Sequence, residues 1–88
     1  MPELAGIYLL YAAENLILDL LRENAEGLTN SEIGGNTGLN PPIANQRGYV
    51  TWSLLQHLMD QGHVIKLDSR YYLSSAALER ARLRERPL

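Results

Sequence analysis

The sequence predicts a mainly α-helical fold with one small β-hairpin, and three observations support this prediction. First, Thr29 and Glu32 have the spacing of a capping box, so a short helix begins directly after Thr29. Second, apolar residues recur at helical spacing over Arg47–Gln61, which indicates a longer helix. Third, two short β-prone runs within Val64–Leu73 flank a turn, as in a hairpin. With a further helix at each end, these segments predict one domain of residues 1–88.

The composition is that of an ordinary globular chain. Of its 88 residues, 45% are apolar and 20% are charged, which suits one modest hydrophobic core. The absence of cysteine excludes disulfides and thiolate metal sites. Two histidines are too few for a metal centre, so we expect no metal. The sequence gives no signal from which to infer a cofactor or a small-molecule ligand.

Neither a secretion signal nor a membrane span is visible. The first residues lack the basic segment of a signal peptide. The apolar run Leu4–Leu21 is interrupted by Glu14, Asn15 and Asp19, which a membrane-spanning helix would not tolerate. These observations predict a soluble, cytoplasmic protein.

Charge is unevenly distributed along the chain. Residues 1–32 contain six acidic residues and one basic residue, whereas residues 33–88 contain seven basic and four acidic residues. A chain polarised in this way can present a basic face although its total charge is −2. The alternative is that the C-terminal arginines form a solvated helix surface.

The first predicted helix covers Pro2–Asn24 and changes character along its length. Its second half has apolar residues at helical spacing, which we expect to face the core: Leu16, Ile17, Leu20 and Leu21. The first half is apolar on all sides, and a domain this small cannot cover it alone. We therefore expect a partner surface, most simply a second copy of the chain, formed by Ile7, Tyr8, Leu10 and Tyr11. The alternative is that the C-terminal helix folds back over it.

The short second helix has signals at both ends. Leu28 and Ile33 form a hydrophobic staple around the capping box, and Gly38 is suited to the left-handed residue that ends a helix. Gly34 and Gly35 are poor helix formers, which suggests the close approach of another helix. The following segment, Asn40–Gln46, reads as a linker or an irregular turn.

The third predicted helix, Arg47–Gln61, has an apolar stripe that we expect to face inward: Val50, Leu54, Leu55, Leu58 and Met59. The flanks and outer face then carry Thr51, Trp52, Ser53, Gln56, His57 and Asp60. For Trp52 two interpretations stay open, packing against the first helix or the hairpin as part of the core and stacking near sugar and phosphate. Gly62 is the expected helix stop.

In the predicted hairpin, we expect four side chains to point inward: Val64, Leu67, Tyr71 and Leu73. The outward positions are Lys66, Arg70 and Tyr72, and a register slip of one residue would invert the two faces. Ser74 or Ser75 then caps a last helix, Ala76–Arg86.

This order of elements, together with the run YVTWSLLQHLMDQGHV (residues 49–64) and Tyr71–Leu73, resembles the winged helix-turn-helix family. The resemblance spans about residues 16–74. This segment is similar to modules in bacterial and archaeal DNA-binding proteins, including some attached to restriction-type nucleases. It divides the domain into a first helix (1–24), a helix-turn-helix (28–61), a wing (63–74) and a C-terminal helix (75–86).

The resemblance implies a dimeric, regulatory DNA-binding protein that reads duplex DNA with the helix 47–61 and the wing, for example in transcription regulation. The side chains with suitable chemistry for phosphate or base contacts are Asn45, Gln46, Arg47, Thr51, Ser53, Gln56, Lys66 and Arg70. The alternative is a winged-helix interaction module, or a subunit of a larger complex, without DNA contact. No nucleophile–base pair and no glycine-rich phosphate loop stands out, so we expect no enzymatic activity.

Overall fold

The computed structural model describes residues 2–40 and 48–85, and the side chains of these residues except 2–7, 81, 84 and 85. The chain is mainly helical and has a small antiparallel sheet of three strands. In chain order the elements are α1 (Pro2–Glu23), β1 (Leu28–Thr29), α2 (Asn30–Thr37), α3 (Tyr49–Asp60), β2 (Val64–Leu67), β3 (Arg70–Leu73) and α4 (Ser75–Glu85).

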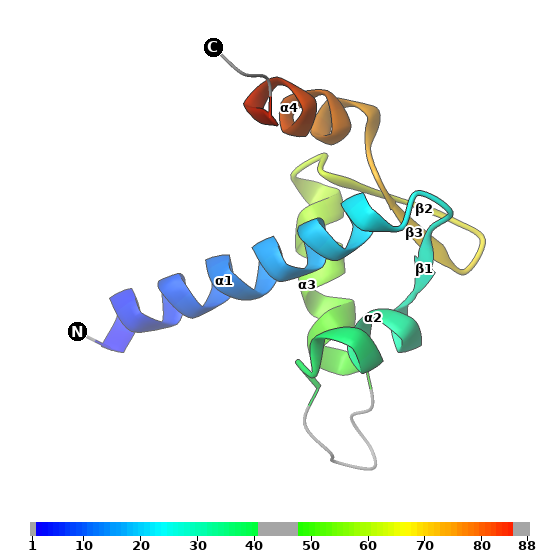
Figure 1. Cartoon of the computed structure of the whole chain (residues 1–88). Helices are drawn as coiled ribbons and strands as arrows, with labels where there is room; N and C mark the ends of the chain where they lie inside the picture. Colours follow the sequence, from blue (N-terminus) through cyan, green and yellow to red (C-terminus); the bar gives the residue numbers. More distant parts are fainter. Residues whose placement is uncertain (1, 41–47, 86–88) are drawn as a thin grey trace.

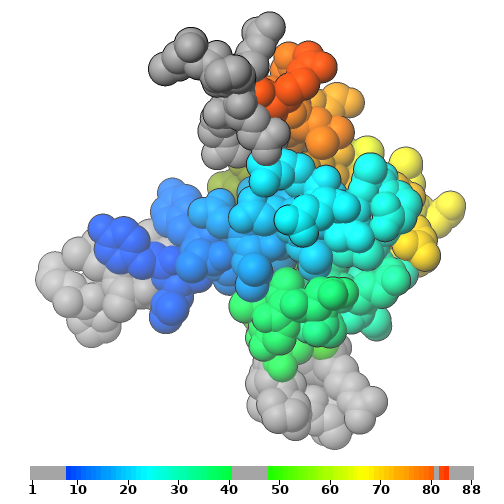
Figure 2. Space-filling model, in the orientation of Figure 1, coloured from blue at the N-terminus to red at the C-terminus, as the bar shows by residue number. Residues whose placement is uncertain are grey.

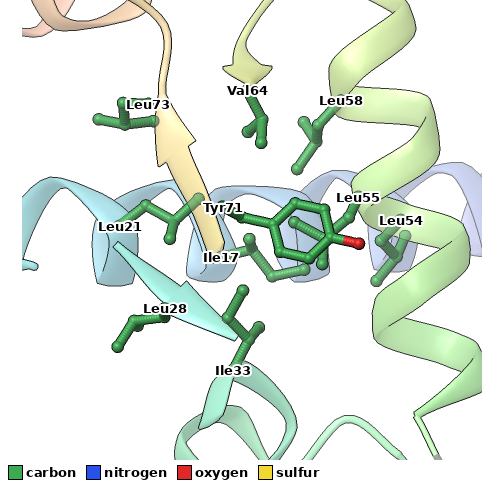
Figure 3. Close-up of a cluster of buried hydrophobic side chains, with 10 residues drawn as sticks. All are labelled: Ile17, Leu21, Leu28, Ile33, Leu54, Leu55, Leu58, Val64, Tyr71 and Leu73. Carbon is green, nitrogen blue, oxygen red and sulfur yellow. The ribbon is translucent and has the colours of Figure 1, made fainter. Parts of the chain in front are cut away.

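The helices surround one core. Figure 1 shows α1 crossing α3, with α2 below α1, the sheet beside the C-terminal end of α1, and α4 above α1. Among the side chains that the structure describes, every element except α4 contributes fully buried or nearly buried apolar groups to the centre. Figure 3 shows the ring of Tyr71, which is 2% exposed, in the middle of this cluster with its hydroxyl directed toward α3. The expected inward stripe of α3 is confirmed for Leu54, Leu55 and Leu58.

The sheet contains one strand that the sequence did not predict. β3 is the central strand, with β1 on one side and β2 on the other. β1 has only two residues, paired as Leu28 with Tyr71 and Thr29 with Arg70, which is too short for an alternating pattern. Because β1 runs directly into α2, it ties the start of that helix to the hairpin.

The predicted capping box of α2 is confirmed. The hydroxyl of Thr29 accepts a hydrogen bond from the amide of Glu32 at 3.1 Å, and the Glu32 carboxylate accepts one from the amide of Thr29 at 2.9 Å. At the other end, Gly38 has φ 68° and its amide donates to the carbonyl of Gly34. A Cβ atom on Gly34 would collide with the Asn40 amide, so the expected close approach is made by a side chain there.

The capping box predicts a pH-dependent contribution to stability. The hydrogen bond from the Thr29 amide, aided by the Thr29 hydroxyl and by nearby Arg70, lowers the pKa of Glu32 from its ordinary value of 4.5. A lowered folded-state pKa stabilises the fold above pH 4.5, and this stabilisation is lost as the pH falls through the folded-state value. We therefore expect the stability difference between wild type and Glu32→Gln to shrink between pH 7 and pH 3 in urea unfolding. An equal difference at both pH values would contradict this account.

Candidate nucleic-acid interface

The start of α3 is held by side chains from elsewhere in the chain. Its N-cap residue, Gly48, has φ 75° and no side chain that could cap the helix. Asn40 takes over this role, because its Oδ1 accepts a hydrogen bond from the amide of Thr51 at 3.0 Å. Asn30, on α2, donates from Nδ2 to the carbonyl of Gly48 at 3.0 Å. The helix consequently begins at Tyr49, two residues later than the sequence predicted.

Thr51 is the centre of this polar cluster. Its hydroxyl donates to Oδ1 of Asn30 at 2.6 Å and accepts from Nδ2 of Asn40 at 3.1 Å, and the side chain is 0% exposed. The prediction that Thr51 lies on the flanks or outer face of the helix is therefore wrong, and its buried side chain is not open to a contact with DNA. A hydroxyl that satisfies two partners can be buried without penalty, and a pattern that counts only apolar residues does not detect it. Thr51 instead fixes α3 against α2.

Two aromatic side chains are exposed near the start of α3. Trp52 is 46% and Tyr49 is 59% exposed, and their rings stack with centroids 6.2 Å apart and planes at 28°. Of the two interpretations of Trp52, packing in the core is thus wrong. The stacked pair offers a flat apolar surface with polar groups at its edges, as binding surfaces commonly do.

The predicted contact residues on α3 have different outcomes. Ser53 and Gln56 are half-buried. Asn45, Gln46 and Arg47 lie outside the described residues. The described helix, Tyr49–Asp60, contains neither lysine nor arginine. Its own side chains therefore supply no permanent positive charge for phosphate contacts.

The two cations of the hairpin are exposed, and both also contact the protein. Arg70 donates from Nη1 to the carbonyl of Gly27 at 2.8 Å, and the same atom lies 3.5 Å from Oε1 of Glu32. The ammonium group of Lys66 lies 5.4 Å from the centre of the Tyr71 ring. Both side chains are exposed, so their cationic groups are accessible to an anion from solvent.

The register of the hairpin corrects one predicted orientation. Lys66 pairs with Tyr71, and Leu67 pairs with Arg70. Since side chains alternate along a strand, Lys66 shares the face of buried Val64, and Leu67 shares the opposite face, where it is 59% exposed. The inward prediction for Leu67 is therefore wrong. Lys66 is exposed, as predicted, although its strand position shares the face of Val64. The inward predictions for Val64, Tyr71 and Leu73 are confirmed.

The first half of α1 stands out from the body of the molecule, as Figure 2 shows for its blue segment. Tyr8 is 71%, Leu10 is 42% and Tyr11 is 62% exposed. The side chain of Ile7 lies outside the described residues. The alternative, in which the C-terminal helix folds back over this half of α1, is therefore wrong, because Tyr8 and Tyr11 are not covered.

A side-chain pair that the sequence did not reveal joins α1 to α3. Nδ1 of His57 lies 2.6 Å from Oε2 of Glu14, whose side chain is only 7% exposed, whereas that of His57 is 46% exposed. The two residues are 43 positions apart, so no local pattern could have paired them. A nearly buried carboxylate needs such a partner.

Comparison with known proteins adds no assignment: no protein-family model matches the chain, and no curated protein or solved structure is significantly similar to it. None of the helices in the described part is long and apolar enough to cross a membrane. Within residues 2–40 and 48–85, acidic and histidine side chains nowhere form a group of three suited to a metal ion.

Proposed function

We propose that this chain is a dimeric, regulatory DNA-binding protein with a winged helix-turn-helix fold. In this fold α2 and α3 form the helix-turn-helix, and the β2–β3 hairpin is the wing. The proposal is supported by the order of helices and strands and by the pairing of β1 and β2 on either side of β3.

One observation carries the proposal: on one side α3 is hydrogen-bonded to α2, and on its other side it is exposed to solvent. The contacts of Thr51 with Asn30 and Asn40 fix the start of α3. Tyr49 and Trp52 on the same helix remain open to solvent. A recognition helix needs this combination, because base reading requires side chains held in a fixed orientation on a rigid support.

In the proposed complex, the first turns of α3 enter the major groove. Ser53 and Gln56 are the described side chains that contact base edges or phosphates, and Arg47, with Asn45 and Gln46, extends the contacts ahead of the helix. Tyr49 and Trp52 pack against the sugar–phosphate backbone. Lys66 and Arg70 contact phosphates from the wing. Because few phosphates are neutralised, binding is modest and strongly salt-dependent.

A titration of a fluorescent DNA duplex at two salt concentrations tests this proposal. We expect saturable binding at ~50 mM salt that weakens by about tenfold or more at ~200 mM salt. Lys66→Gln should weaken binding to all sequences alike and reduce the salt slope by about one. Arg82→Gln, on α4, removes an exposed cation outside the proposed interface and should change neither value. No binding to any duplex at ~50 mM salt would refute the proposal.

A second function, a winged-helix module that binds another protein and no DNA, is favoured by the lack of lysine and arginine on α3 and by the exposed Tyr49–Trp52 pair. Tyrosine and tryptophan often dominate protein interfaces. Alanine at Arg47 and Gln56 separates the two functions. These substitutions weaken DNA binding under the first and leave partner binding unchanged under the second.

A further inference from the structure

A continuous stripe of side chains runs along one side of α1. Tyr8, Tyr11, Asn15, Leu18 and Arg22 follow one another at alternating spacings of three and four residues. This spacing places them on one face of a helix and is the spacing of helices that pack along their length. The first two members, Tyr8 and Tyr11, are 71% and 62% exposed. We call these five residues the tyrosine stripe.

The other half of the tyrosine stripe borders a groove between α1 and α4. The groove has a volume of about 440 Å³. Asn15, Leu18 and Arg22 line it on the α1 side, and Ala77 and Leu83 line it on the α4 side. Figure 1 shows α4 next to the C-terminal half of α1 only, away from the protruding N-terminal half. One helix face thus has exposed aromatic side chains at one end and an open groove at the other.

We propose that the groove receives Tyr8 and Tyr11 of a second copy of this chain. The two α1 helices run antiparallel, with the two-fold axis at Asn15. This arrangement brings Tyr8 next to the partner's Arg22 and Tyr11 next to the partner's Leu18. By symmetry both grooves are filled, and the assembly closes at two copies.

The chemistry of the contact fits a second copy. The groove has apolar walls and charged edges, and a tyrosine presents an apolar ring with a polar tip. At the axis, the two Asn15 side chains meet, and an amide can donate to and accept from its own copy. A single asparagine in such a seam fixes the register of the two helices.

The expected area is also sufficient. Each covered tyrosine buries about 150 to 250 Å², and a dimer covers four of them. Since the grooves lose a comparable area, the interface exceeds the total of about 1,000 Å² that specific protein contacts require. This inference specifies the dimer contact of the proposed protein, and the experiments below contain no DNA, so a failure of DNA binding leaves them unaffected.

Matched substitutions on neighbouring residues test the contact. Tyr8 and Leu9 are both 71% exposed, so replacing either by serine should not unfold the protomer, but only Tyr8 belongs to the tyrosine stripe. In sedimentation equilibrium of the full chain, we expect Tyr8→Ser to raise the dimer dissociation constant at least about tenfold. Leu9→Ser should change it less than about threefold, whereas Leu83→Ser, in the groove, should also weaken the dimer.

Three outcomes would overturn the proposal. The first is that the wild-type chain is monomeric at ~100 µM. The second is that Tyr8→Ser and Leu9→Ser change the dimer dissociation constant equally, and the third is that Leu83→Ser leaves this constant unchanged. A crosslinking experiment checks the position of the axis independently, because the natural chain has no cysteine. A short thiol crosslinker should join two copies of the Asn15→Cys variant efficiently. Crosslinking of Leu16→Cys that is equally efficient would contradict an axis at Asn15.

Discussion

Replacing Thr51 by valine is expected to lower the free energy of unfolding by about 2 kcal/mol, although the two side chains have nearly the same shape. Valine can neither donate to Asn30 nor accept from Asn40, so both amide groups lose a partner that lies 2.6 Å or 3.1 Å away. Leaving partly buried polar groups unpaired costs more than the bonds themselves contribute. Urea unfolding of the two proteins measures this difference.

Thr51→Ser is the matched control for this prediction. Serine keeps the hydroxyl and loses one buried methyl group, which costs about 1 kcal/mol. If Thr51→Val proves as stable as wild type, the polar cluster does not hold α3 to α2. The support for the proposed recognition helix would then fail as well.

We expect His57→Ala to destabilise the protein by about 2 kcal/mol, because it leaves Glu14 nearly buried without its partner at 2.6 Å. A fully buried pair would cost more, but solvent screens the half-exposed imidazole. Glu14→Gln should cost less, since a neutral amide keeps the shape and can still hydrogen-bond to the ring. Thermal or urea unfolding of both variants, and of the double variant, measures the coupling between α1 and α3.

Gln56→Ala provides the comparison, because Gln56 precedes His57 on the same helix. Its substitution should change stability by no more than about 0.5 kcal/mol. A loss for His57→Ala that is no larger than this would show that the Glu14 contact does not stabilise the fold.

The sequence alone determined the features that depend on neighbouring residues. The capping box of Thr29 and Glu32 and the left-handed end of α2 at Gly38 were correctly predicted. Ser74, one of two predicted caps, accepts a hydrogen bond from the amide of Ala77 and so caps α4, which begins at Ser75. Gly62, with φ 79°, follows the end of α3 as expected. Each of these signals lies within a few residues along the chain, so local conformation suffices to produce it.

Only the tertiary structure decided the features that join distant segments. β1 became a strand because β3 offered it hydrogen-bonding partners. Thr51 became buried because Asn30 and Asn40 satisfied its hydroxyl, and Glu14 because His57 reached it. The identity of a single polar residue does not predict whether it will be buried, because burial depends on a hydrogen-bonding partner. Here these partners are 11 to 43 residues away along the chain. The candidate site therefore depends on packing, whereas the helix ends around it depend on local sequence.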